Sequence, residues 1–318
     1  MKALFASFLL ATLCAAPAHG RELTMLTTLP VSSPVEHVAV CGHSGLAAAL
    51  GRDGSITVFR PASAEVVTRR PPEAGLSVLA CASDGKLLAT SKSDETVVIA
   101  DVSGTALRRF SMRGKRVADL MFSPDSSMLA VLLYESPAQL WDVAHGTLIA
   151  ALHTNFSGSA RVDFSPDSSR LATADLDTTV RIYDRAGNLK AKYTALLLES
   201  FALGFTRDDK QLVVGGADSN LTFLDAADGH LLRTLPTSSD PIVFAWPLPG
   251  GNSLLSMHLD ANSLKHSTVL VWNLATAKSR ALPIDVTKVA GGGEPQKDLP
   301  VLFLRDSDTS VTAWVLPD

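Results

Sequence analysis

The chain has 318 residues and a formal net charge of −4 at pH 7, with 46% hydrophobic and 19% charged residues. The acidic balance argues against nucleic acid as a general partner, because such a partner favours a basic domain. Beyond residue 20, no run approaches the roughly 18 apolar residues that a membrane-spanning helix needs. The length alone is compatible with two domains, so the organisation must come from the pattern along the chain.

Residues 1–20 have the features of a cleaved signal peptide: a positive Lys2, an apolar run, and small residues at the cleavage sites around Ala18. The alternative, a membrane anchor, needs a longer apolar run. A lipoprotein anchored at Cys14 is disfavoured, because Leu13 precedes it where a small residue is required. We therefore expect an exported protein, periplasmic or secreted, in which residues 21–318 form one domain without a transmembrane segment.

Residues 160–193 contain four short, largely apolar stretches separated by three polar turns. The first turn, Ser165–Ser168, has the Pro, Asp and Ser residues that are typical of a type I turn. The third stretch, Thr179–Tyr183, alternates between apolar and polar residues, which is the period of a β-strand. Lys190 and Lys192 mark the last stretch as an exposed edge strand. The segment therefore predicts a four-stranded antiparallel sheet.

This pattern recurs along the whole chain. The aromatic or apolar residues that end the third stretch of each unit are separated by 41, 41, 42, 41, 48 and 42 positions. A period of about 40 to 45 residues with four strands per unit is typical of a β-propeller. These anchor residues are Phe59, Ala100, Trp141, Tyr183, Leu224, Trp272 and Trp314.

An acidic residue precedes the third stretch in most units, where it is expected to shape the turn. The third unit has Glu135 and the sixth has His266 at this place. The predicted structural acids of the repeat turn are Asp53, Asp94, Asp177, Asp218 and Asp308.

The repeat resembles the WD40 family, and the resemblance covers nearly the whole chain after residue 20. The Trp-Asp pair of that family occurs as Trp141-Asp142, and degenerate forms include Tyr183-Asp184 and Trp272-Asn273. The resemblance implies a propeller that binds other proteins. The Gly-His pair of the family is not recognisable in most units, so we expect its buried polar network to be broken in most blades.

The two ends of the chain predict how the ring closes. The last unit stops after its third strand, near Trp314, whereas residues 22–29 form a spare strand ahead of the first unit, which starts near Val35. An N-terminal strand that completes the last blade removes the open interface between first and last blades. We therefore predict an all-β, seven-bladed propeller of four-stranded antiparallel blades, closed in this way and monomeric.

Cys41 and Cys81 occupy equivalent places at the ends of the first strands of two adjacent blades. A disulfide between them requires Cα atoms within roughly 7 Å. The alternative is a pair of small buried thiols, and the sequence leaves both open.

The search for catalytic motifs is negative: the chain has no HExxH, Walker A, GxSxG or CxxC motif. The Asp175-x-Asp177 pair lacks a following Glu at the spacing of a cation loop, so turn formation explains it better. We expect no catalytic residue, no metal site and no cofactor.

Two features remain as candidate interaction sites. The first is the insertion that accounts for the 48-residue step, a loop between the second and third strands of the sixth blade. Its candidate residues are Leu259, Asp260, Asn262, Lys265 and His266. The second is a basic patch for an acidic partner or an anionic lipid surface, for which protection of exposed edge strands is the alternative explanation. Its residues are Arg69, Arg70, Arg108, Arg109, Arg113, Lys115 and Arg116.

Two functions follow as hypotheses. The first is a non-enzymatic, exported scaffold that binds protein partners, and it is favoured because the first strands of the blades contain few Asp, Glu or His residues. The second is a lactonase-like or quinoprotein-like propeller that binds or converts a small molecule at polar residues of its central channel. Carboxylates and histidines converging at the channel mouth would favour the second.

Overall fold

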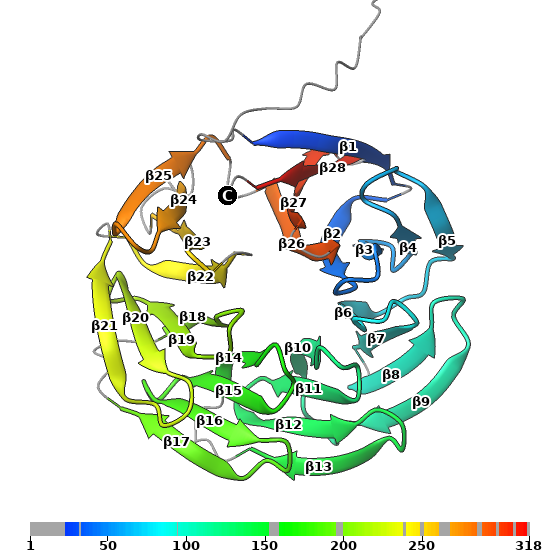
Figure 1. The fold of residues 1–318 in the computed structure, drawn as a ribbon. Helices are drawn as coiled ribbons and strands as arrows, with labels where there is room; N and C mark the ends of the chain where they lie inside the picture. Colours follow the sequence, from blue (N-terminus) through cyan, green and yellow to red (C-terminus); the bar gives the residue numbers. More distant parts are fainter. Residues whose placement is uncertain are drawn as a thin grey trace, which may run out of the picture.

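The computed structural model describes residues 23–316 except 32, 94, 153–158, 195–199, 238–239, 249–250, 261–267, 285–287, 297–298 and 308–309. Seven four-stranded antiparallel sheets are arranged as the blades of a ring (Figure 1). In each blade we call the strands A to D from the centre outward. A–B, B–C and C–D turns join the strands of one blade, and D–A connections join successive blades.

Blade 1 comprises β2 (Val35–Val40), β3 (Ala47–Gly51), β4 (Ile56–Phe59) and β5 (Val66–Arg70). Blade 2 comprises β6 (Leu76–Cys81), β7 (Leu87–Lys92), β8 (Thr96–Asp101) and β9 (Ala106–Ser111). Blade 3 comprises β10 (Val117–Phe122), β11 (Met128–Leu133), β12 (Ser136–Asp142) and β13 (Thr147–Ala151). Blade 4 comprises β14 (Ser159–Phe164), β15 (Arg170–Asp175), β16 (Val180–Asp184) and β17 (Leu189–Tyr193).

Blade 5 comprises β18 (Ser200–Phe205), β19 (Gln211–Gly216), β20 (Asn220–Asp225) and β21 (Leu231–Pro236). Blade 6 comprises β22 (Ile242–Pro247), β23 (Ser253–His258), β24 (Thr268–Asn273) and β25 (Lys278–Leu282). Blade 7 comprises β26 (Val289–Gln296), β27 (Leu299–Ser307), β28 (Ser310–Val315) and, from the other end of the chain, β1 (Thr24–Pro30).

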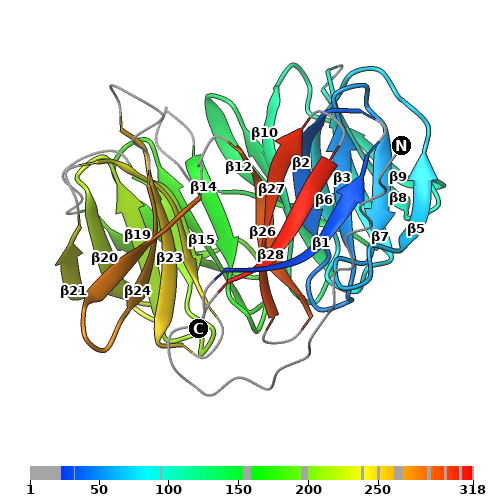
Figure 2. The ribbon, with the colours of Figure 1, turned by 90° about the horizontal axis from the view of Figure 1, so that it is seen from above.

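The predicted fold and its closure are confirmed. β1 pairs antiparallel with β28, with Met25 opposite Trp314 and Leu29 opposite Val311 (Figures 1 and 2). The strand begins and ends slightly later than the predicted segment, at Thr24 and Pro30. β26 contacts β2, so the last blade packs directly on the first and the ring is complete. Within the described residues, no helix is long and apolar enough to cross a membrane.

The core consists of one apolar cluster at each junction between neighbouring blades. Strands B and C supply most of it; every residue of β11 (MLAVLL) is buried, for example. Each cluster draws residues from two neighbouring blades, as Val180 and Ile182 of blade 4 pack with Phe205 and Leu212 of blade 5. A blade alone would leave these faces in water, so the ring rather than the blade is the stable unit.

The innermost strands share an irregularity that positions the channel side chains. In each of the seven, the pairing with strand B shifts by one residue directly after the first position, as between Val117 and Asp119. Such a β-bulge re-aims the side chains that follow it. The residues after the bulge therefore hold equivalent places around the channel: His37, Val78, Asp119, Arg161, Ala202, Phe244 and Gly291.

Candidate functional site

A cavity among the described residues lies at one mouth of the central channel. Because neighbouring strands are antiparallel, the A–B and C–D turns share one face of the ring, which we call the A–B face. The B–C turns and D–A connections form the opposite B–C face. A cavity of about 600 Å³ opens on the A–B face, and we call it the channel-mouth pocket. Its lining includes Met121, Asp163, Phe164, Leu203, Phe205, Arg207, Phe244, Trp246 and Pro247.

Repeat geometry brings these residues together. Met121, Asp163, Gly204 and Trp246 lie two positions beyond the bulge in four successive A strands. At Gly204, an added Cβ would lie 2.8 Å from Cδ of Pro247 and 3.2 Å from the carbonyl oxygen of Ala245. Glycine therefore allows β18 to approach β22 closely at this wall of the pocket.

Asp163 is the acidic side chain of this lining. Its Oδ2 accepts a 2.7 Å hydrogen bond from the backbone N–H of Phe205 in the next blade. Burial raises the pKa of Asp163 to about 7, although the amides of Phe205 and Phe164 oppose the rise. The group therefore exchanges a proton near neutral pH, inside a largely apolar cavity.

A second polar group lies at the level of the bulge, deeper in the channel. Burial lowers the pKa of His37, while the charge of Asp119 opposes this change. Burial raises the pKa of Asp119, which accepts a 2.8 Å hydrogen bond from the N–H of Leu120 and is opposed by the charges of His37 and Arg161. Because blades 1 and 3 are not neighbours, the interaction of His37 with Asp119 crosses the channel.

Asp119 and Asp163 were not singled out in the sequence, because the A strands contain few acidic residues overall. Asp163 directly precedes Phe164 in VDFSPD, where blade 3 has Met121 in LMFSPD. That substitution of an acid for an apolar residue at one repeat position is the signal that could have found it.

The predicted basic patch divides into structural and free residues. Arg108 donates to the carbonyl oxygen of Ala144 in the next blade. The side chain of Arg70 lies against Gly104, also in the next blade, and its Nη2 lies 3.9 Å from a carboxylate oxygen of Glu73. Both arginines therefore connect neighbouring blades, whereas Arg69 is exposed on β5.

The rest of the patch follows the end of β9 into the D–A connection on the B–C face. Arg109, Arg113, Lys115 and Arg116 are all exposed. The guanidinium carbon of Arg116 lies 3.9 Å from the ring centroid of Tyr134, which is 49% exposed. We call these four basic residues and Tyr134 the cationic surface. It joins positive charge to an accessible aromatic ring.

The candidate loop of blade 6 is described only at its start. Leu259 and Asp260 are partly buried, and the N–H of Leu259 donates to the carbonyl oxygen of Pro241. Asn262, Lys265 and His266 lie outside the described residues. The loop remains a prediction.

Three repeat-turn acids are described, and each accepts from the backbone N–H two positions later. Asp53 bonds to Ser55, Asp177 to Thr179 and Asp218 to Asn220, at 2.9, 3.1 and 3.2 Å. Asp94 and Asp308 lie outside the described residues. In blade 4, Arg181 also pairs with Asp175 and Asp177 in a buried network.

Blade 6 contains a buried polar network of its own. Ser256 lies between two rings: its hydroxyl accepts from Nε1 of Trp272 and contacts Nε2 of His258, both at 2.8 Å. His258 is fully buried, and burial lowers its pKa. The indole N–H of Trp272 is therefore satisfied by the hydroxyl of Ser256, which in turn contacts His258 on the same strand B.

Cys41 and Cys81 are joined by a disulfide, with their Cα atoms 4.7 Å apart. This separation lies well within the limit for a bridge, because the A strands converge toward the axis of the ring. The bond links blades 1 and 2 close to the A–B face.

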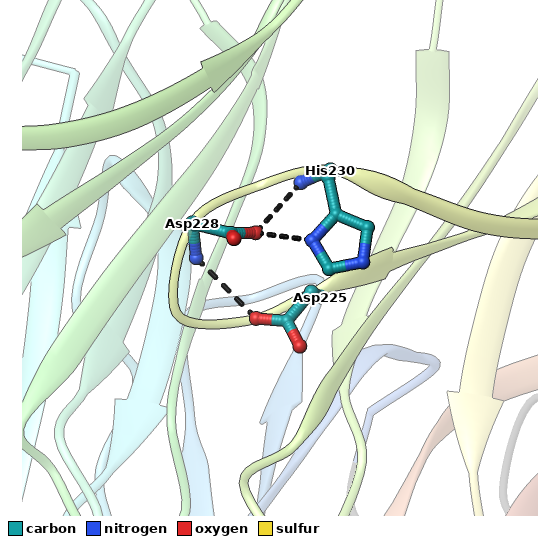
Figure 3. Close-up of side chains that lie close together, drawn as sticks. All are labelled: Asp225, Asp228 and His230. Atoms are coloured by element: carbon teal, nitrogen blue, oxygen red, sulfur yellow. Dashed lines mark hydrogen bonds and ion pairs between the residues drawn. The ribbon is translucent and has the colours of Figure 1, made fainter.

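One group of possible metal ligands occurs among the described residues, in the C–D turn of blade 5. Asp225, Asp228 and His230 offer ligand atoms within 4.8 Å of one another (Figure 3). Asp225 already accepts from the N–H of Asp228, and Asp228 from the N–H and the ring of His230. These bonds within an exposed turn account for the cluster.

The geometry thus defines a closed seven-bladed ring with a ligand-sized pocket on one face and a cationic surface on the other. A family model described as WD domain, G-beta repeat, matches residues 146–184, which run from the end of blade 3 through β16. This match and the seven-bladed ring identify the chain as a WD40-like β-propeller.

Two curated relatives are both named U3 small nucleolar RNA-associated protein 15 homolog. The chain is 33% identical over 109 residues to the one from Xenopus laevis and 32% identical over 104 residues to the one from Xenopus tropicalis. Each match covers 32% of this chain and 20% of the relative. The chain therefore matches about a fifth of the length of these relatives.

The expected location was wrong. The relatives are named for association with a small nucleolar RNA, which contradicts an exported, periplasmic or secreted protein. Residues 1–20 and Cys14, on which the expectation rested, lie outside the described residues.

Proposed function

We propose that this protein is a non-enzymatic scaffold that binds an acidic segment of a protein partner through its cationic surface. The closed ring supports this role, because seven packed junctions hold the turns of the B–C face in fixed positions. The observation that carries the proposal is the set of exposed basic residues between Arg109 and Arg116, in which Arg116 lies against Tyr134.

Charge and shape together favour a partner over a merely solvated edge. Among the described contacts, Arg109, Arg113 and Lys115 have no carboxylate within ion-pairing distance, whereas Arg52 and Arg60 elsewhere on blade 1 do. Arginine and tyrosine are also the residue types enriched at the energetic centres of interfaces. Because the chain as a whole carries a negative charge, an acidic partner is attracted to the cationic surface and not to the rest of the molecule.

The test is chemical cross-linking and capture of the full chain from its native cells, compared between two charge-matched variants. R113E/K115E reverses two charges of the cationic surface, and K192E/K278E reverses two exposed lysines on outer strands. We expect one protein to be recovered with the wild type and with K192E/K278E, and to fall by about tenfold or more with R113E/K115E.

Nuclease treatment before capture decides the nature of the partner. The names of the relatives make RNA the relevant competing outcome. Recovery that disappears after nuclease treatment, or that both variants reduce equally, contradicts the proposal.

A further inference from the structure

The channel-mouth pocket lies on the face opposite the cationic surface, so its ligand must be inferred separately from the scaffold function. Its volume of about 600 Å³ falls within the range of small-molecule sites. Apolar atoms supply most of its walls, and the partly exposed aromatic residues among them are Phe244 and Trp246. Such a cavity suits a ligand with a compact apolar body.

One polar group of the wall sets the chemistry of that ligand. A carboxylate has room for about four donors, and the described donors to Asp163 are the backbone amides of Phe205 and Phe164. Among the described residues, the groups that oppose the raised pKa of Asp163 are these two amides, and no charged side chain is among them. A ligand cation would supply the missing opposite charge, and the neighbouring aromatic rings also attract cations.

The other charged groups in and near the pocket lie at different levels of the channel from Asp163. His43 and Arg207 come from A–B turns, and they lie at the rim of the pocket. Arg161, Asp119 and His37 lie at the deeper bulge level, where Asp119 interacts with both basic groups. Asp163 lies between these levels, beside the apolar wall.

We propose that the channel-mouth pocket binds a small organic ammonium compound, with its charged nitrogen against Asp163 and its apolar body against Phe244 and Trp246. This site is independent of the scaffold function, because it shares no residue with the cationic surface. R113E/K115E therefore leaves amine binding unchanged, and failure of either proposal is distinguishable from failure of the other.

The test uses three probes of similar size on the full chain: 2-phenylethylamine, 2-phenylethanol and 3-phenylpropionate. Titration calorimetry at pH 8 measures affinity, and tryptophan fluorescence locates the ligand beside Trp246. We expect the amine to bind about tenfold more tightly than the alcohol, and the carboxylate not to bind. The fluorescence change is expected to disappear in W246F, because the reporting indole is lost.

Asp163→Asn separates the ionic role from the structural one. The Asn side-chain oxygen can still accept from the N–H of Phe205, so the bridge between blades 4 and 5 is retained. The preference for the amine over the alcohol is expected to vanish in D163N and to persist in D228N, which removes an exposed carboxylate elsewhere. In the wild type, amine affinity falls as the pH drops below about 7, because Asp163 takes up a proton.

Several outcomes overturn the proposal. Equal binding of amine and alcohol, tighter binding of the carboxylate, or amine binding that D163N leaves unchanged would each do so. Binding of Nα-acetyl-lysine amide without binding of 2-phenylethylamine would assign the pocket to a peptide instead. If D163N does not fold, two other results decide the question. The wild type must prefer the amine over the alcohol, and the fluorescence change must disappear in W246F; failure of either contradicts the proposal.

Discussion

The backbone N–H of Asp125 donates a 3.0 Å hydrogen bond to the hydroxyl of Ser168, 43 positions later in the chain. Both residues belong to A–B turns, and the bond joins the turn of blade 3 to that of blade 4. Ser168 has a φ of +60°, the left-handed conformation that directs its side chain to the preceding blade. Equivalent bonds join Asp84 to Ser126 and Asp167 to Asp209.

This series predicts that Ser168→Ala weakens the junction between blades 3 and 4. Ser168 is 1% exposed, so its loss leaves the amide of Asp125 without a partner at a site that water reaches poorly. We expect a loss of about 1–2 kcal/mol in unfolding free energy, measured by urea denaturation. Ser126→Ala is the control, because its bond is longer, at 3.3 Å, and exposed. Equal losses in the two variants would contradict the prediction.

The C–D turns make a second set of contacts between blades, and Gly187 shows it most clearly. Its φ is +78°, and an added Cβ would lie 2.3 Å from Cβ of Ala150 in the preceding blade. Gly114 has a similar φ of +85° but nothing within 4 Å. We expect G114A to cost about 1 kcal/mol from backbone strain alone and G187A to cost about 1–3 kcal/mol more. Thermal unfolding of the pair measures the difference, and equal midpoints would show that the contact relaxes freely.

Closure of the ring by β1 predicts that two residues of this strand contribute unequally to stability. Leu29 is 2% exposed and packs in one cluster with Val301 and Phe303, whereas Met25 is 53% exposed on the same strand. Leu29→Ala is expected to lower the unfolding free energy by about 2–4 kcal/mol, and Met25→Ala by less than about 0.5 kcal/mol. Denaturant titration tests both. A small effect of L29A would mean that β1 contributes little to closure.

The disulfide between Cys41 and Cys81 predicts a redox-dependent stability. It closes a loop with a sequence separation of 40 residues, for which loss of chain entropy in the unfolded state is worth about 3–4 kcal/mol. The double variant C41S/C81S is therefore expected to melt at a lower temperature than the oxidised wild type and to be insensitive to dithiothreitol. A wild-type melting temperature that dithiothreitol leaves unchanged would contradict this expectation.

The fold was predictable because its signals are local and repeated seven times. The turn sequence Ser165–Ser168 and the alternation of apolar and polar residues before Tyr183 indicate the strands and the repeat period without any tertiary information. The channel pocket was not predictable in this way, since the bulge after the first residue of each A strand decides where Asp163 lies. The sequence also could not separate the structural from the free residues of the basic patch. Arg108 donates to a carbonyl oxygen of the next blade, which is a contact between segments 36 positions apart.

The raised pKa of Asp163 makes the stability of the ring depend on pH. The pKa is about 7 in the folded protein, against a reference value of 3.8. Between these values the folded state binds more protons than the unfolded state, so the unfolding free energy contributed by Asp163 falls as the pH rises. This contribution is present in full below the reference value and is lost as the pH rises to about 7.

Asp163→Asn removes this titration while keeping an acceptor for the N–H of Phe205. We expect the stability of D163N relative to the wild type to rise between pH 4 and pH 7, by at most about 1.4 kcal/mol per pH unit, and to stay constant above pH 7. Asp119 titrates in both proteins and cancels in the difference. The control is D101N: the hydroxyl of Ser103 lowers the pKa of Asp101, so its own effect appears only on acidification below the reference value of 3.8. Urea titrations at each pH measure the difference, and a D163N curve parallel to that of the wild type would show that Asp163 ionises at an ordinary pH and that the pocket is well hydrated.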